Sequence, residues 1–117
     1  MFQVDFDTQE GCSVRVVIVE TRKELQQVVQ SVAWVTGDKS LYNPSKTIHA
    51  ATLYPFGKII LLLSRQDLTW ECITHEATHV AHTLKGKNEE EDIAIHVGQL
   101  TSAIAKELKG HGYKILL

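Results

Sequence analysis

The stretch that decides the fold is residues 70–84, WECITHEATHVAHTL. Its apolar residues recur at intervals of three and four, as on one side of an amphipathic helix; they are Trp70, Ile73, Ala77, Val80, Ala81 and Leu84. The pattern predicts a helix from about Asp67 to Lys85, with residues 64–67 providing the N-terminal cap. Because a helix turns by about 100° per residue, His75 and His79 fall nearly opposite the apolar side. We therefore expect both histidines to face a cleft or solvent.

Residues 75–79 of this helix have the pattern H-E-x-x-H. Two histidines four residues apart are about 6 Å apart along a helix axis and project from one face, so both imidazoles can reach one metal ion. Glu76 points about 100° around the helix from His75, beside such an ion, where a general base for a metal-bound water is needed. His82 is about 10 Å from His75 along the axis, too far to bind the same ion. The competing explanation is a pair of exposed histidines without a metal.

The composition limits the classes of protein. At 117 residues, 44% hydrophobic and 22% charged, the chain is expected to form one globular domain, residues 1–117, with room for one site. The net charge of −2, without a stripe of Lys or Arg, argues against nucleic acid and anionic membrane surfaces as partners. The N-terminus lacks the features of a signal peptide, and the longest apolar run, residues 59–63, is too short to span a bilayer. We therefore expect a soluble, cytoplasmic protein with no membrane partner.

Four segments in the first half of the chain have the character of strands. Residues 2–6 alternate apolar and polar side chains, and residues 14–19 are almost all β-branched, which predicts a pair of strands with a long connection. Residues 48–54 and 58–63 are two β-prone runs on either side of residues 55–57, Pro-Phe-Gly. They predict a hairpin whose second strand is central and buried.

A first helix is predicted between these two pairs of strands. Thr21 and Glu24 have the spacing of a capping box, so we expect a helix that runs to about Val35 and stops at Gly37. Residues 36–47 are rich in Gly, Asp, Ser, Asn and Pro and have no apolar period. They predict one long loop, which we expect at the rim of the site.

The last third of the chain predicts a final helix. Gly86 is expected to end the helix at about residues 67–85, and Asn88 is expected to cap the N-terminus of the final helix. Its core face is predicted to consist of Ile93, Val97, Leu100, Ile104 and Leu108, and a side of small residues that another helix can approach closely consists of Ala94, Gly98 and Ala105. Residues 110–112 end the helix. Together the elements predict an α+β fold, with a mixed β-sheet packed against three helices and H-E-x-x-H on the second helix.

H-E-x-x-H followed by a helix that opens with E-x-x-A resembles the pattern of the thermolysin-like zincins, or gluzincins. Residues 75–79 and 88–98 are similar to the small metallopeptidases carried by bacteriophages and prophages, and the resemblance extends over about residues 67–108. In that family the glutamate three residues before the alanine is the third zinc ligand, which implies Glu91 here. This chain departs from the family at Ile95, where an aromatic residue is usual, and in a shorter gap between the second histidine and Glu91 than the larger enzymes have.

The residues themselves leave the third ligand open. A hydrolytic zinc site needs three protein ligands and one open position for water. Helical angles place Glu90 nearest the apolar face and Glu91 on the side of small residues, whereas distance along the axis favours Glu91. Glu91 also stands where a capping box has its acid, which explains a glutamate there without a metal. Glu90 is therefore the main alternative ligand, followed by Asp92, His96 or a water.

The residues and the resemblance together predict a zinc hydrolase, most simply a peptidase. In this prediction Zn²⁺ is held by His75, His79 and Glu91 and lowers the pKa of its bound water toward about 7, while Glu76 takes the proton. The resemblance implies that a strand of the hairpin at residues 48–63 aligns a peptide or protein substrate along the cleft.

The reaction needs a donor for the oxyanion, and Tyr54, Tyr113 and His111 are candidates by chemistry. The alternative function is a non-catalytic zincin-like module that binds a metal or another protein, because a chain of this length lacks the second subdomain that walls the cleft of large peptidases. A histidine-bearing domain with no site is the third explanation. The sequence leaves the substrate and the oligomeric state undetermined.

Overall fold

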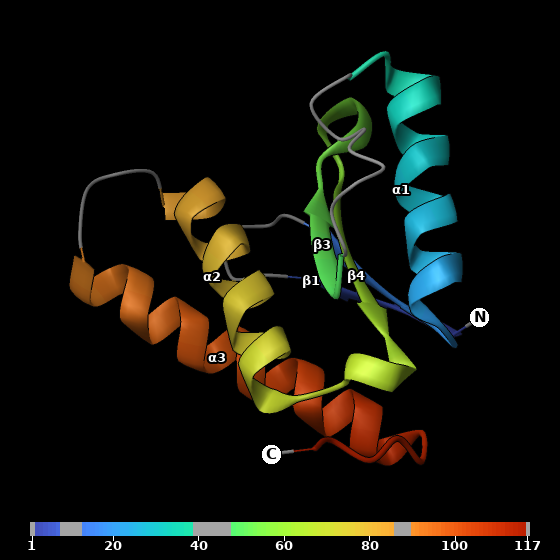
Figure 1. The fold of residues 1–117 in the computed structure, drawn as a ribbon. Helices are drawn as coiled ribbons and strands as arrows, with labels where there is room; N and C mark the ends of the chain where they lie inside the picture. Colours follow the sequence, from blue (N-terminus) through green and yellow to red (C-terminus); the bar gives the residue numbers. More distant parts are fainter. Residues whose placement is uncertain (1, 8–12, 39–47, 86–89, 117) are drawn as a thin grey trace.

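The computed structural model describes residues 2–7, 13–38, 48–85 and 90–116, and the side chains of residues 84–85 and 90–92 lie outside the described part. Four strands and three α-helices lie within these residues (Figure 1). They are β1 (Phe2–Asp7), β2 (Ser13–Val19), α1 (Arg22–Thr36), β3 (Ala50–Leu53), β4 (Ile59–Ser64), α2 (Trp70–Lys85) and α3 (Glu90–Gly110), with short 3-10 turns η2 (Pro55–Gly57) and η3 (Arg65–Asp67). The predicted α+β class, with H-E-x-x-H on the second helix, is confirmed.

The strands form one mixed sheet in the order β1-β2-β4-β3. β1 pairs antiparallel with β2, and β3 pairs antiparallel with β4, where Thr52 lies opposite Leu61. The two pairs are joined by parallel pairing of β2 with β4, which places Val16 opposite Leu61. Parallel neighbours require a crossover connection, and α1 lies within it. Both predicted strand pairs and the central position of β4 are confirmed.

The side chains of β4 divide the core between the two faces of the sheet. Leu61 and Leu63 are buried on the face covered by α2 and α3, whereas Leu62 is buried on the face covered by α1. Figure 1 shows α1 on one side of the sheet and the pair α2 and α3 on the other. Because successive side chains of a strand point to opposite faces, the run of apolar residues in β4 serves both cores.

The ends of α1 follow the sequence signals closely. The Glu24 N–H donates to Thr21 Oγ1 over 3.2 Å, which satisfies one of the unpaired donors of the first turn. At the other end Gly37 has a φ of 73°, a left-handed conformation that a side chain disfavours and that ends the helix. The predicted cap and the predicted stop are confirmed.

The predicted cap of α2 is wrong. The Ser64 hydroxyl accepts from the Gln66 N–H over 3.2 Å and so caps the turn η3, not the helix. The helix is capped by Thr69, whose Oγ1 accepts from the Cys72 N–H over 3.1 Å. Leu68 separates the two caps because its side chain, 1% exposed, is buried in the core while its backbone is non-helical. The helix therefore begins at Trp70.

An ion pair links the start of α1 to the turn before α2. Arg22 donates from Nε and from its second terminal nitrogen to the two carboxylate oxygens of Asp67, over 2.6 Å and 2.7 Å. His49 Nδ1 lies 3.3 Å from Asp67 Oδ1. The hydrogen bond from Arg22, with a smaller contribution from His49, holds the pKa of Asp67 below its ordinary value. This group of three residues connects the elements on the two faces of the sheet.

The predicted core face of α3 is confirmed by Ile93, Leu100, Ile104 and Leu108, which are buried, and by Val97, which is partly buried. The predicted side of small residues is wrong in its first half, because Ala94 and Gly98 are exposed and a Cβ at Gly98 would meet no atom of the described residues within 4 Å. Ala105 is buried as predicted. α2 therefore packs against the apolar face of α3, and that stretch of small residues faces outward.

After α3 the chain returns to the start of α2. The Leu116 N–H donates to the Leu68 carbonyl over 2.8 Å, and the Trp70 N–H donates to the Leu116 carbonyl over 3.0 Å. The predicted features at Gly86 and Asn88, and residues 39–47 of the predicted loop, lie outside the described residues. Among the described residues, no helix has the length and the apolar character needed to cross a membrane.

Candidate metal centre

His75 and His79 lie on the side of α2 that is turned away from the core. Ile73, Ala77 and Val80, each 0% exposed, fix the opposite side of the helix against the sheet and α3. Both histidines are exposed, and the side chain of His75 is 70% exposed. The predicted orientation of the two histidines is confirmed.

The two imidazoles converge. Their Nε2 atoms are 3.2 Å apart, and their ring planes meet at 74°. Two nitrogen ligands at about 2.0–2.1 Å from a tetrahedral zinc ion are about 3.3 Å apart, so the observed separation suits two ligands of one ion. The same distance suits an N–H···N hydrogen bond between neutral imidazoles. The geometry therefore supports metal binding without requiring it.

Glu76 lies beside this pair and is buried. The residue is 4% exposed, and its Oε2 is 4.0 Å from His75 Nε2. That distance exceeds the roughly 3.3 Å expected between two ligands of one tetrahedral ion, so the carboxylate lies beside the pair of imidazoles and not at the spacing of a third ligand. Within the described residues, the potential ligand atoms of His75, Glu76 and His79 all lie within 4.8 Å of one another. One turn of α2 thus brings together two exposed imidazoles, whose nitrogens could bind a metal, and a buried carboxylate.

The strand β3 contacts the same turn of α2. Thr52 Oγ1 donates to Glu76 Oε1 over 3.2 Å and also lies 3.4 Å from the Glu76 carbonyl oxygen. Sequence reasoning missed Thr52, because its contact joins residues 24 positions apart. The one available signal was its polar, β-branched side chain among the apolar residues of a predicted strand, at a position where alternation points it to the face opposite Leu53.

Tyr54 is the candidate oxyanion donor that lies near the histidines. Its hydroxyl donates to the His79 carbonyl over 3.3 Å and accepts from Thr83 Oγ1 over 2.9 Å. The other two candidates contact a different part of the molecule, since the rings of His111 and Tyr113 pack against Phe2 at 4.6 Å and 5.3 Å between centroids. Tyr54 therefore remains a candidate, on condition that its hydroxyl leaves the helix carbonyl.

The predicted third ligand belongs to the part of α3 whose side chains are not described. Glu91 and the alternatives Glu90 and Asp92 lie outside the described side chains. His96 is buried, 6% exposed, and lines a hollow of about 260 Å³ with residues of β1 and β2, so it does not join the pair of histidines. His82 is exposed and also stays outside the group. Because the side of small residues faces outward, the choice of Glu91 rests on axial distance and on the resemblance.

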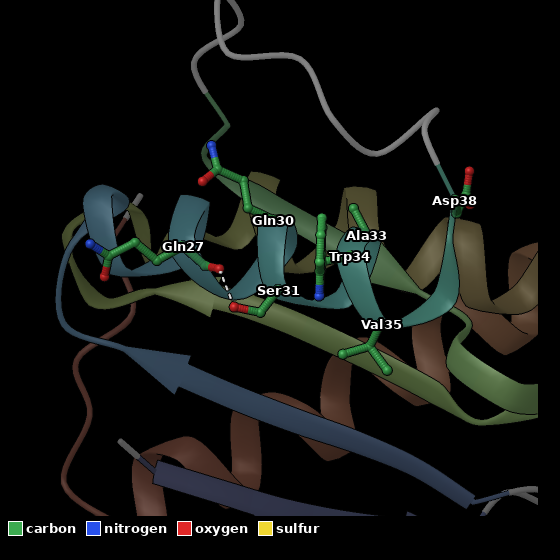
Figure 2. Close-up of a pocket in the computed structure, with 7 residues that line it drawn as sticks. All are labelled: Gln27, Gln30, Ser31, Ala33, Trp34, Val35 and Asp38. Atoms are coloured by element: carbon green, nitrogen blue, oxygen red, sulfur yellow. Dashed lines mark hydrogen bonds between the residues drawn. The ribbon is translucent and has the colours of Figure 1, made fainter.

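A separate hollow of about 980 Å³ lies against α1, on the other face of the sheet (Figure 2). It is lined by Trp34 and Val35, which are 87% and 66% exposed, by other residues of the same helix and by Asp38, which follows it. Among the described residues that line it, Asp38 alone has an ionisable side chain. This surface therefore lacks the groups needed for the chemistry that the side chains of α2 can perform.

Comparisons with known proteins give no relative: no family model matches the chain, and no curated protein or solved structure matches it.

Proposed function

We propose that this protein is a zinc-dependent hydrolase with a small zincin-like fold, and that it cleaves peptide bonds. The observation that carries the proposal is the convergence of the His75 and His79 Nε2 atoms at 3.2 Å, with the buried carboxylate of Glu76 beside them. The order of strands and helices, with the histidines on a helix that packs beneath the sheet, supports the zincin-like fold.

The residues would share the work as follows. His75 and His79 hold the zinc ion, and Glu91 is proposed as the third ligand. The bound zinc ion would supply a water of lowered pKa and would polarise the substrate carbonyl. Glu76 accepts the proton of the attacking water at Oε2 and returns it to the leaving amine.

The strand β3 is proposed to align the substrate. β3 is the last strand in the order β1-β2-β4-β3, so one of its edges has no neighbour within the described sheet. An extended peptide can add to such an edge through main-chain hydrogen bonds. Thr52 of β3 contacts α2 at Glu76, and Tyr54, which follows the strand, contacts α2 at His79. A peptide bound to β3 would therefore lie next to the proposed reacting groups.

Zinc content and hydrolysis in three variants test the proposal. The purified protein is expected to hold about one zinc ion per chain. His79→Ala is expected to weaken zinc binding by at least about a hundredfold, whereas His82→Ala, an exposed histidine on the same helix, should not. Glu76→Gln should retain zinc and lose about 10²- to 10⁴-fold in hydrolysis of a mixture of unstructured peptides. Equal zinc binding by the His79→Ala and His82→Ala variants would overturn the metal site.

One observation favours a second function, a non-catalytic metal-binding module. The side chain of His75 is 70% exposed, so the described residues do not enclose it as a cleft would. A module of this kind would bind zinc and lose it in His79→Ala, yet the unaltered protein would cleave no peptide in the mixture. The same experiment therefore separates the two functions.

A further inference from the structure

We propose that Thr52 is a positioning residue for Glu76: by holding one carboxylate oxygen, it directs the other toward the two histidines. The inference rests on the proposed function, because Glu76 has a reaction to perform only if the site is hydrolytic. The contact itself, Thr52 Oγ1 to Glu76 Oε1, measures 3.2 Å.

The carboxylate is the better acceptor for the Thr52 proton. A hydroxyl has a single proton to donate, and two oxygens of Glu76 are in reach. The carboxylate Oε1 is the nearer of the two, at 3.2 Å, while the main-chain carbonyl oxygen is at 3.4 Å. The shorter contact has the better distance for a hydrogen bond, so the hydroxyl proton points to Oε1.

Burial makes this hydrogen bond decisive for the orientation of Glu76. The residue is 4% exposed, so bulk water cannot solvate its carboxylate from all sides, and a buried carboxylate needs protein donors. With Oε1 held by Thr52, the oxygen on the histidine side is Oε2, at 4.0 Å from His75 Nε2. A glutamate has three side-chain torsions, and this contact selects the arrangement in which one oxygen faces the proposed metal.

Thr52 is itself rigidly placed. It pairs with Leu61, which is 0% exposed in the central strand, and its β-branched side chain has few rotamers. Its hydroxyl therefore approaches Glu76 from a fixed backbone, as a support for a reacting group must. The competing explanation is that Thr52 only packs β3 against α2, in which case its shape matters and its hydroxyl does not.

Two substitutions at Thr52 separate these roles in the zinc-loaded protein. Thr52→Val keeps the shape and removes the hydroxyl, while Thr52→Ser keeps the hydroxyl and removes the methyl group. We expect Thr52→Val to lower kcat by about ten- to a hundredfold with KM and zinc content unchanged, and Thr52→Ser to retain kcat within about threefold of the unaltered protein. The matched control is Thr101→Val in α3, because the Thr101 hydroxyl has no hydrogen-bond partner within the described residues. An unchanged kcat in Thr52→Val, or equal losses in the valine and serine variants, would overturn the proposal.

A measurement on the metal-free protein keeps this inference separate from the proposed function. The ¹³C resonance of the Glu76 carboxyl carbon, assigned by its absence in Glu76→Gln, should shift in Thr52→Val and keep its position in Thr52→Ser and Thr101→Val. An unshifted resonance in Thr52→Val overturns the positioning role whether or not the protein is an enzyme. A shifted resonance in a protein that hydrolyses no peptide shows the contact while the hydrolase proposal fails.

Discussion

The two faces of the sheet differ in how completely they are covered. Within the described residues, the core beneath α2 and α3 has fifteen buried members, and the core beneath α1 has six. The first face contains the buried carboxylate of Glu76, held between helix and strand. The second leaves Trp34 and Val35 exposed on α1. The proposed general base therefore lies on the face where packing fixes the backbone of both the helix and the strand that hold it.

Adjacent leucines of β4 test the difference between the two cores most strongly. Leu61 and Leu62 are both 0% exposed but point to opposite faces. Each substitution to alanine leaves a cavity and should lower the free energy of unfolding by about 2–5 kcal/mol, with Leu61→Ala nearer the upper value because the larger core is less able to collapse around the void. Urea unfolding of both variants gives the two costs. A larger cost for Leu62→Ala would contradict the ranking of the two faces.

The ion pair that joins the faces should have a smaller effect, one that depends on pH. The Arg22–Asp67 pair is bidentate, with Asp67 11% and Arg22 48% exposed, so Asp67→Asn is expected to cost about 1 kcal/mol at pH 7. Because the pKa of Asp67 is lowered in the folded protein, its contribution is present above the unfolded value of about 3.9 and is lost as the pH falls through the folded value. Unfolding of both proteins between pH 7 and pH 2 should show the difference shrinking below about pH 4.

The control for the Arg22–Asp67 ion pair is the Asp5–Arg15 ion pair, which joins the neighbouring strands β1 and β2. Asp5 also has a lowered pKa, because Arg15 donates a hydrogen bond to it, but both side chains are about half exposed and belong to neighbouring strands. Asp5→Asn should therefore cost less than Asp67→Asn. An equal cost would mean that the link between the faces contributes no more than an exposed surface pair.

The smallest effect is expected on the exposed surface of α1. Trp34→Gln should change the free energy of unfolding by less than about 0.5 kcal/mol, because the indole is 87% exposed and makes little core contact. Trp70, which is partly buried with the Lys109 ammonium 5.0 Å from its ring centroid, then becomes the remaining tryptophan. Acrylamide should quench the fluorescence of the variant less than that of the unaltered protein. A large loss of stability would show that α1 covers its face more tightly than the exposures indicate.

Features set by neighbours in the chain were predictable from the sequence. The Thr21 cap, the Gly37 stop, both strand pairs and the outward direction of the two histidines depend on spacings of a few residues. The parallel pairing of β2 with β4 was not predicted. An apolar run indicates that a strand is buried, but it does not indicate which strand lies beside it.

The errors have a common physical cause. The cap of α2 was predicted within residues 64–67, whereas the structure places it at Thr69, because Ser64 caps the turn η3 and the buried Leu68 follows that turn. Small residues such as Ala94 and Gly98 are compatible both with a close helix contact and with solvent exposure. Tertiary packing decides between the two, and in this fold both residues are exposed. Thr52 was missed for the same reason, because the residues next to Thr52 and next to Glu76 in the chain do not indicate that these two side chains are in contact.

The parallel pairing of β2 with β4 has a consequence for the order of folding. Thr52, His75, Glu76 and His79 all belong to the continuous segment of residues 50–85, whose hairpin and helix need only short loops to close. The pairing of Val16 with Leu61 instead joins distant parts of the chain and must wait for a long loop to close. The segment with the proposed reacting groups is thus expected to assemble first, and the β1–β2 hairpin to dock onto it in the slower, later step.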